Sequence, residues 1–153
     1  MQRREFLTCA SAAVAISAGV HKLLTDNAVH EIKRAVIAWT EAFTDRSIDD
    51  REYASLMTSD YRAVENGNVI DLTAEMRARQ QLPSAFERAH RYRFGRIDQQ
   101  GRTASVELEV DAEITDGRHG VRRRSWAGHV QLRHEGGKWL ASGLRSVAME
   151  RAV

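Results

Sequence analysis

The sequence predicts an α+β protein in which N-terminal helices pack on a strongly curved antiparallel sheet. Three observations carry this prediction. Apolar residues recur at helical spacing early in the chain, strict apolar–polar alternation runs through 104–114, and hairpin-type turn dipeptides separate the later segments. Because helices come first and a run of strands follows, the order is that of an α+β domain and not of alternating βαβ units.

The first predicted helix begins at a capping residue within 25–27 and carries one apolar stripe that we expect to lie on the concave face of the sheet. A second, short helix is expected over 47–59. A third begins at a cap at Thr73 and runs to Gln81, ahead of the helix-breaking Pro83. The stripe of the first helix consists of Val29, Ile32, Val36, Trp39 and Phe43.

Tight turns at Asn66-Gly67 and Asp116-Gly117 divide the strands. Read as a two-residue turn, the second of these sets Asp111 opposite Arg122 and Glu109 opposite Arg124, as ion pairs on the solvated face. Strands are expected at 60–65, 69–70, 90–97, 104–114, 121–133 and 138–149.

The same register places Arg123 on the apolar face, where a positive charge needs either an acidic partner, such as Glu65 or Asp60, or an anionic ligand. The strand over 121–133 also has apolar residues on both faces. Either a bulge near Gly128 exchanges the faces, or the outer face is apolar and buries against a second subunit. We expect a homodimer through this sheet face, around Trp126 and Trp139.

The first 24 residues predict an export leader. Arg3-Arg4-Glu5-Phe6-Leu7 resembles the twin-arginine signal, and a mild apolar stretch over 7–20 with small residues follows it. We expect the export machinery to bind this leader and to deliver the chain to the periplasm or the cell exterior. The leader is either cleaved or retained as an anchor, and the domain proper spans 25–150.

Composition narrows the function classes. The only cysteine of the 153-residue chain, Cys9, lies in the leader, which leaves the body without disulfides, thiolate catalysis or Cys-ligated zinc. The sequence pI of about 9.0 looks basic, but acidic and basic residues are equal in number from residue 23 onward. This balance argues against nucleic-acid binding, and we expect neither a metal nor a cofactor.

From Trp39 and Phe43 late in the first helix, through Ser59-Asp60-Tyr61, to the closing segment with Gly136-Gly137-Lys138-Trp139, the order of features resembles the nuclear transport factor 2-like superfamily, including SnoaL-like domains. The resemblance covers about residues 26–150 and implies a cone-shaped, cystatin-like roll. That superfamily hosts isomerases, dehydratases, cyclases and non-enzymatic binding or dimerising modules, so the fold leaves the function open.

Within such a cone, the expected pocket is lined by Trp39, Phe43, Tyr61, Tyr92 and Arg123. The candidate catalytic residues are Glu65, His90 and His129. The base position of a ketosteroid isomerase falls at Asn66, or at Glu65 if the register slips by one, and the first helix offers no tyrosine. Three functions stay open, in this order: a small-molecule binding domain, an isomerase, lyase or cyclase, and a dimerising module.

Overall fold

The computed structural model describes residues 26–118 and 120–149. Contacts within the chain divide it into two units, Met1–Glu31 and Ile32–Val153. Of the first unit, residues 26–31 are described, and they are helical. The predicted leader with Arg3 and Arg4 lies outside the described residues. No helix in the described ranges has the length and apolar character that a membrane crossing requires.

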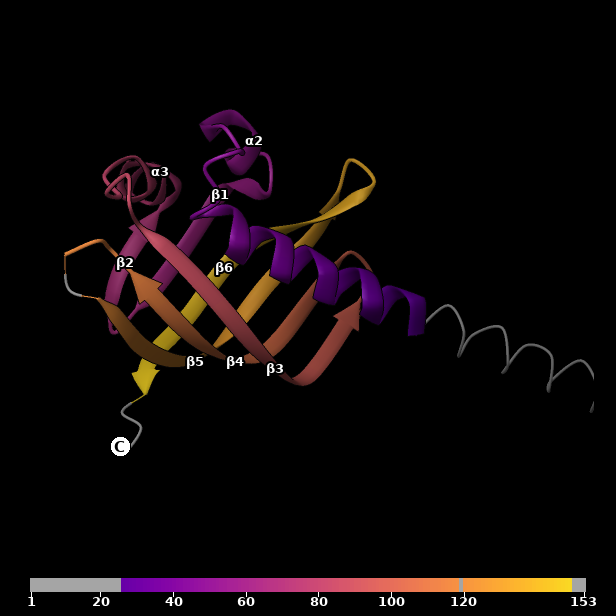
Figure 1. The fold of residues 1–153 in the computed structure, drawn as a ribbon. Coiled ribbons are helices and arrows are strands. Elements are labelled where there is room, and N and C mark those ends of the chain that lie inside the picture. Colours follow the sequence, from indigo (N-terminus) through magenta and orange to yellow (C-terminus); the bar gives the residue numbers. More distant parts are fainter. Residues whose placement is uncertain (1–25, 119, 150–153) are drawn as a thin grey trace, which may run out of the picture. The chain divides into compact units, whose positions relative to one another are not determined.

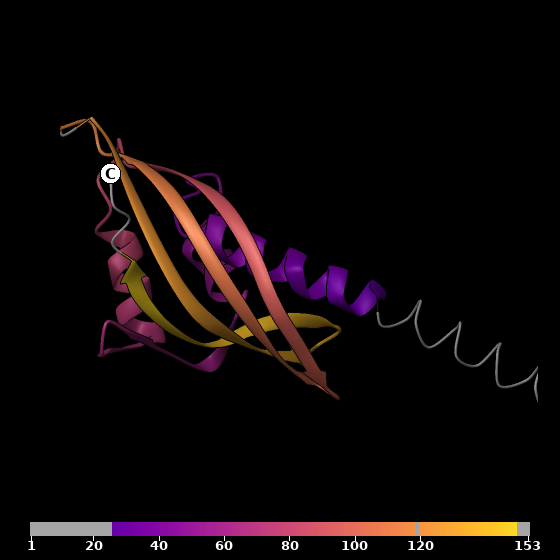
Figure 2. The ribbon, with the colours of Figure 1, turned by 90° about the horizontal axis from the view of Figure 1, so that it is seen from below.

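The first helix spans 26–42, and its part within the second unit buries the predicted stripe. Ile32 and Val36 are fully buried and Trp39 is nearly so, while Phe43, just past the last helical residue, is partly buried. Figures 1 and 2 show this part of the helix crossing one face of the sheet. The helical spacing of the stripe therefore places it against the core, as expected.

The next two helices differ in detail from their predictions. Helix α2 is only Asp50–Ala54, capped by Asp49, because the chain turns into a strand at Met57, which pairs with Ala141. Helix α3 is Leu72–Gln80. Its cap is not Thr73 but the residue at position 71, whose carboxylate accepts a 2.8 Å hydrogen bond from the Ala74 amide.

The six strands form one sheet in the order β2-β1-β6-β5-β4-β3. All neighbours are antiparallel except β1 and β6, which run parallel. The long strands bend along their length, and the sheet is not closed into a barrel (Figure 2). The strand bounds are Met57–Glu65 (β1), Asn68–Asp71 (β2), Glu87–Gln100 (β3), Thr103–Thr115 (β4), Val121–Glu135 (β5) and Lys138–Met149 (β6).

The predicted register between β4 and β5 was wrong. The chain reverses through a five-residue connection at 116–120 instead of a two-residue turn, so Thr115 faces Val121 and Glu113 faces Arg123. Because the shift is odd, every side chain of β5 changes face. Arg123 therefore lies on the outer face and pairs with Glu113 at 3.2 Å, while Arg122 and Arg124 lie on the concave side.

The same register resolves the two apolar faces of β5 without a bulge at Gly128. Trp126 faces Val110 and Val130 faces Val106, so both share the concave face with the buried side of β4. Gly128 allows close approach of β6, since a Cβ there would lie 2.5 Å from the Arg145 carbonyl oxygen. The irregularity lies instead between Gln131 and Leu132, against β6.

The tryptophans that were expected to form a dimer contact therefore belong to the core side. Trp139 is only 9% exposed, and Trp126 packs against the core cluster. The outer face around β3 and β4 carries ion pairs instead, such as Arg93 with Glu109 at 2.9 Å. The homodimer stays a prediction, but the apolar outer surface around Trp126 and Trp139 on which we based it is not there.

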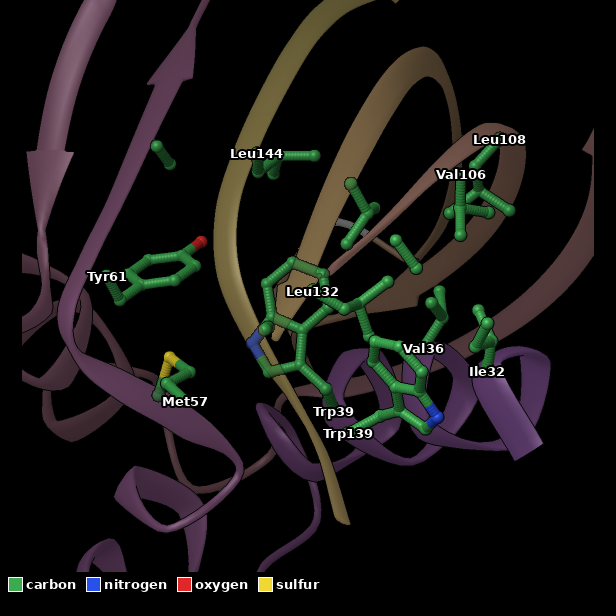
Figure 3. Close-up of a cluster of buried hydrophobic side chains, with 14 of the residues drawn as sticks. Ile32, Val36, Trp39, Met57, Tyr61, Val106, Leu108, Leu132, Trp139 and Leu144 are labelled. Atoms are coloured by element: carbon green, nitrogen blue, oxygen red, sulfur yellow. The ribbon is translucent and has the colours of Figure 1, made fainter. Parts of the chain in front are cut away.

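The core lies between the first helix and the concave face. Its buried side chains come from that helix, from α2 and from β1, β4, β5 and β6, and those labelled in Figure 3 point into the space between helix and sheet. Strand β4 supplies the longest continuous row, in which every second residue from Ala104 to Ile114 is buried. The alternation of that strand is confirmed, and it fixes which face of the whole sheet is the inner one.

Candidate functional site

A cavity of about 1190 Å³ opens on the concave side of the sheet. Trp39 and Thr40 come from the end of the first helix and Phe43 from just beyond it. Helix α2 contributes Tyr53, and α3 contributes Ala74, Glu75 and Ala78. Strands β1 to β6 and Asn66 in the turn after β1 supply the rest. Its apolar wall includes Trp39, Phe43, Tyr61, Ile70, Ile114, Trp126 and Leu144. Trp39 and Tyr61 meet edge to face, with ring centroids 5.9 Å apart.

Arg88 brings a positive charge into this cavity from the start of β3. It faces Ile114 across the pair of strands, and its Cζ lies 5.8 Å from the centre of the Phe43 ring and 5.5 Å from that of Phe86. These contacts are of cation–π type. Burial and the like charge of Arg124 lower the pKa of Arg88, whereas the negative charges of Glu65 and Glu75 raise it in part.

Four acidic residues line the same cavity: Asp111 and Glu113 from the outward-facing positions of β4, and Glu65 and Glu75 from β1 and α3. Glu65 ends β1 beside Ser146 of β6, and Glu75 sits in the first turn of α3. Burial raises the pKa of Glu65, and Arg88 opposes this rise only in part. Burial likewise raises the pKa of Glu75, although the Tyr53 hydroxyl donates a 2.7 Å hydrogen bond to it. Both groups therefore hold a proton more readily than exposed carboxylates do.

His90 lies two residues after Arg88 on the same face of β3. Its ring stacks on that of Tyr92, with centroids 5.6 Å apart, and Tyr92 stacks on Phe94 in turn. Burial, assisted by the charge of Arg88, lowers the pKa of His90 to about 4. Its buried Nε2 has no hydrogen-bond partner among the described residues. At neutral pH this histidine is therefore an uncharged group in the cavity wall.

The structure brings together most, but not all, of the predicted site residues. Among pocket residues, Trp39, Phe43 and Tyr61 line the cavity, and so do the catalytic candidates Glu65 and His90.

Arg123 also borders the cavity, but its side chain is 84% exposed and is paired with Glu113, so the prediction of an inward-facing charge was wrong. Tyr92 lies on the concave face of β3 but packs against the core, and the cavity lining formed by the described residues does not include it. His129 lies on the outer face, opposite Glu107 and beside Arg145, and it borders a separate, smaller groove of about 580 Å³. His129 therefore lies on the other side of the sheet from Glu65, and these two catalytic candidates do not share a site.

Sequence reasoning missed Arg88, Glu75, Tyr53 and Arg124. Arg88 carried a signal, since it alternates in step with His90 and Tyr92. Arg124 was assigned to the outer face by the incorrect turn. Glu75 and Tyr53 meet only because α2 and α3 pack together, and no spacing in the sequence indicates that contact.

The described residues contain no cluster of three or more His, Cys, Asp or Glu side chains arranged to hold a metal ion. The polar side chains that line the cavity include arginine, carboxylate, histidine and tyrosine groups. A proton can move to or from the carboxylates, and the guanidinium can hold a negative charge.

No protein-family model matches the chain, and no curated protein matches it. Solved structures do. A nuclear transport factor 2-like protein of unknown function from Silicibacter pomeroyi aligns with a TM-score of 0.62 at 14% identity, over 82% of this chain and 98% of that one. A candidate dehydratase of the same family from Streptomyces avermitilis aligns with a TM-score of 0.66 at 17% identity, over 83% and 99%.

A protein of unknown function with a cystatin-like fold from Nostoc punctiforme aligns with a TM-score of 0.56 at 18% identity, over 78% of this chain and 89% of that one. At such identities the likeness concerns the backbone and not the activity. The predicted architecture is confirmed: the chain has the α+β fold of nuclear transport factor 2-like proteins, with helices on a curved, open sheet.

Proposed function

We propose that this chain binds a small, mostly apolar molecule in the cavity between the first helix, α3 and the sheet. The observation that carries the proposal is the cavity itself, about 1190 Å³ in volume and walled by Trp39, Phe43, Trp126 and Leu144. Ligand sites are concave and largely apolar, with a few polar groups that orient the ligand. Here Arg88, Glu65, Glu75 and His90 are those groups.

Fluorescence of phenylnaphthylamine, an uncharged apolar probe, tests this proposal. Its emission should rise and saturate with the wild-type chain. Ala74 of α3 lines the cavity, so Ala74→Trp should fill part of the space and weaken binding by roughly tenfold or more, about the effect of losing 1.4 kcal/mol of contact. Arg77→Trp, at an exposed position of the same helix outside the lining, is the matched control and should bind as the wild type does.

Absence of saturable binding by the wild-type chain would contradict the proposal. So would equal binding by the wild type and Ala74→Trp, because the probe would then occupy another surface. Circular dichroism of both variants checks that the fold is retained.

A second candidate is an isomerase, lyase or cyclase of the SnoaL-like kind, in which Glu65 removes a proton next to a carbonyl group. The observation that favours it is that Glu65 has a burial-raised pKa and shares the cavity with Arg88, whose charge can stabilise the oxyanion that forms. The likeness to a candidate dehydratase supports the same reaction type.

Solvent deuterium exchange into a cyclic aryl ketone such as tetralone, followed by NMR, tests this second candidate. The wild-type chain should accelerate exchange, and Glu65→Gln should lose about a hundredfold of that rate. Exchange at the buffer rate with the wild type, or an unchanged rate in Glu65→Gln, would rule out Glu65 as a base for such ketones.

Export by the twin-arginine route is part of the proposal. The Arg3-Arg4 pair and the apolar stretch that follows support it. A reporter fused to residues 1–24 should reach the periplasm, and a double Arg3→Lys, Arg4→Lys variant should keep it in the cytoplasm. Equal export of the two fusions would contradict this route.

A further inference from the structure

We propose that the ligand of the cavity carries an anionic oxygen group of the carboxylate type, and that Arg88 binds this group. The inference rests on the proposed function and adds the chemical class of the ligand: a small apolar acid. Its apolar body lies against the aromatic wall, and its charged end lies at the start of β3. Four features of the structure lead to it.

The first feature is that Arg88 is held in place without using its donors. The guanidinium lies near the Phe43 and Phe86 rings, which restrict it through their faces and leave its N–H groups unbonded. No described residue accepts a hydrogen bond from Arg88, and its Nε is buried without a partner. A guanidinium has five N–H donors in a fixed fork, which matches the two oxygens of a carboxylate.

The second feature is a second positive charge on the same wall. Arg124 faces Ala112 on the concave side, lines the cavity, and is close enough to Arg88 to disfavour its charge. Two cations on one wall repel each other, and an anion between or beside them relieves that repulsion. The outward Arg123 does not add to this charge, because Glu113 pairs with it.

The third feature is the state of the nearby acids. Glu65 and Glu75 attract Arg88, yet neither forms an ion pair with it among the contacts of the described residues. Because burial disfavours their charged forms, an arriving anion can be accommodated by proton uptake at these acids. They therefore do not close the site to a ligand of negative charge.

The fourth feature is the apolar surface beside the charge. Trp39, Phe43 and Trp126 line the same cavity as Arg88. An acid with an apolar body gains contact area there that a small inorganic anion does not. A wide apolar wall beside the unpaired guanidinium of Arg88 favours an organic acid over free phosphate or sulfate.

Two probes that share one apolar body test the inference. Anilinonaphthalene sulfonate carries an anionic group, and phenylnaphthylamine lacks it. Arg88→Gln should weaken binding of the sulfonate by roughly tenfold to a hundredfold, the range for a lost charge-assisted contact, while binding of the neutral probe changes less than about threefold. Arg93→Gln is the matched control, because Arg93 is on the outer face of the same strand and pairs with Glu109.

Competition on the wild-type chain provides a second measurement that needs no variant. Naphthoic acid should displace phenylnaphthylamine at concentrations roughly tenfold lower than naphthamide, which has the same shape without the charge. This comparison decides the question even if Arg88→Gln does not fold.

The outcomes separate the two proposals. If phenylnaphthylamine does not bind, the proposed function fails. If it binds but naphthoic acid and naphthamide displace it equally, only the assignment of an acidic ligand is overturned. Equal weakening of both fluorescent probes by Arg88→Gln would show that Arg88 supports the cavity without binding the anion, which also overturns the inference.

Discussion

The Tyr53 hydroxyl donates a 2.7 Å hydrogen bond to Oε1 of Glu75 and so joins α2 to the first turn of α3 in the cavity wall. Tyr53 is 1% exposed, and burial raises its pKa far above the usual range, so its hydroxyl stays protonated at neutral pH and can donate. The bond favours the ionised form of Glu75 and opposes the burial that raises the pKa of this carboxylate.

We predict that Tyr53→Phe lowers the free energy of unfolding by about 1–3 kcal/mol at neutral pH, because it leaves a buried carboxylate without its donor. The pKa of Glu75 should rise further in this variant. Urea denaturation measures the first effect. Tyr61→Phe, which removes the hydroxyl of another tyrosine in the cavity lining, is the control and should cost less than about 1 kcal/mol. Equal losses in the two variants would show that the hydrogen bond contributes nothing specific.

The raised pKa of Glu65 has a defined effect on stability. Between its ordinary pKa and its raised pKa in the folded chain, the folded state binds more protons than the unfolded state, so stability falls as pH rises through that window. Glu65→Gln removes this dependence. We therefore expect the variant to be more stable than the wild type at neutral pH and to lose this advantage at acidic pH.

Thermal unfolding of the wild type and of Glu65→Gln across that pH range measures the effect. Glu52→Gln, on the exposed side of α2, serves as the control and should follow the wild type. A wild-type chain that becomes more stable relative to Glu65→Gln as pH rises would contradict the raised pKa.

Arg79 joins three segments below the cavity. Its guanidinium pairs with Asp50 at 2.5 Å and donates hydrogen bonds to the carbonyl oxygens of Ala42 and Asp45. Arg79→Met keeps much of the buried stem but leaves these acceptors unpaired, so we expect a loss of about 3 kcal/mol in the free energy of unfolding. Arg77→Met, at an exposed position on the same helix, should stay within about 0.5 kcal/mol of the wild type. Similar stability of the two variants in guanidinium chloride would show that the buried contacts are not needed.

His90 should remain uncharged over most of the acidic range. Burial and the charge of Arg88 lower its pKa to about 4, so an NMR titration should show an imidazole that protonates near this value. His90→Asn identifies the resonance. Titration of that resonance near its ordinary value of 6.5 would mean that the site is more open to water than the structure shows.

The sequence predicts those parts of the fold that depend on local periodicity. The alternation from Ala104 to Ile114 places β4 and its inner face correctly, and the spacing from Ile32 to Trp39 places the first helix. Asn66 and Gly67 have φ values of 48° and 82°, which is the left-handed backbone that their dipeptide indicates. In each case the structure is decided by the conformational or burial preference of residues that are close together in the sequence.

The predictions that failed required a choice between two local structures that the sequence favours about equally. A connection of two or five residues after Thr115 differs little in local propensity, yet it decides whether Arg123 or Arg124 enters the cavity. The early end of α2 at Ala54 depends on pairing with β6, more than eighty residues later in the chain, and a local pattern cannot report it. Glu75 was missed for the same reason, because its place in the site depends on the packing of α3 against Tyr53 of α2.

The parallel pairing of β1 with β6 makes the last strand the neighbour of the first, with Met57 beside Ala141 and Glu65 beside Ser146. During synthesis, β1 therefore leaves the ribosome long before its partner, β6, does. Until β6 is available, the edge of β1 that it covers stays unpaired, and pairing between such distant segments is slow. If the proposed twin-arginine leader directs the folded domain to export, this pairing must form before transport.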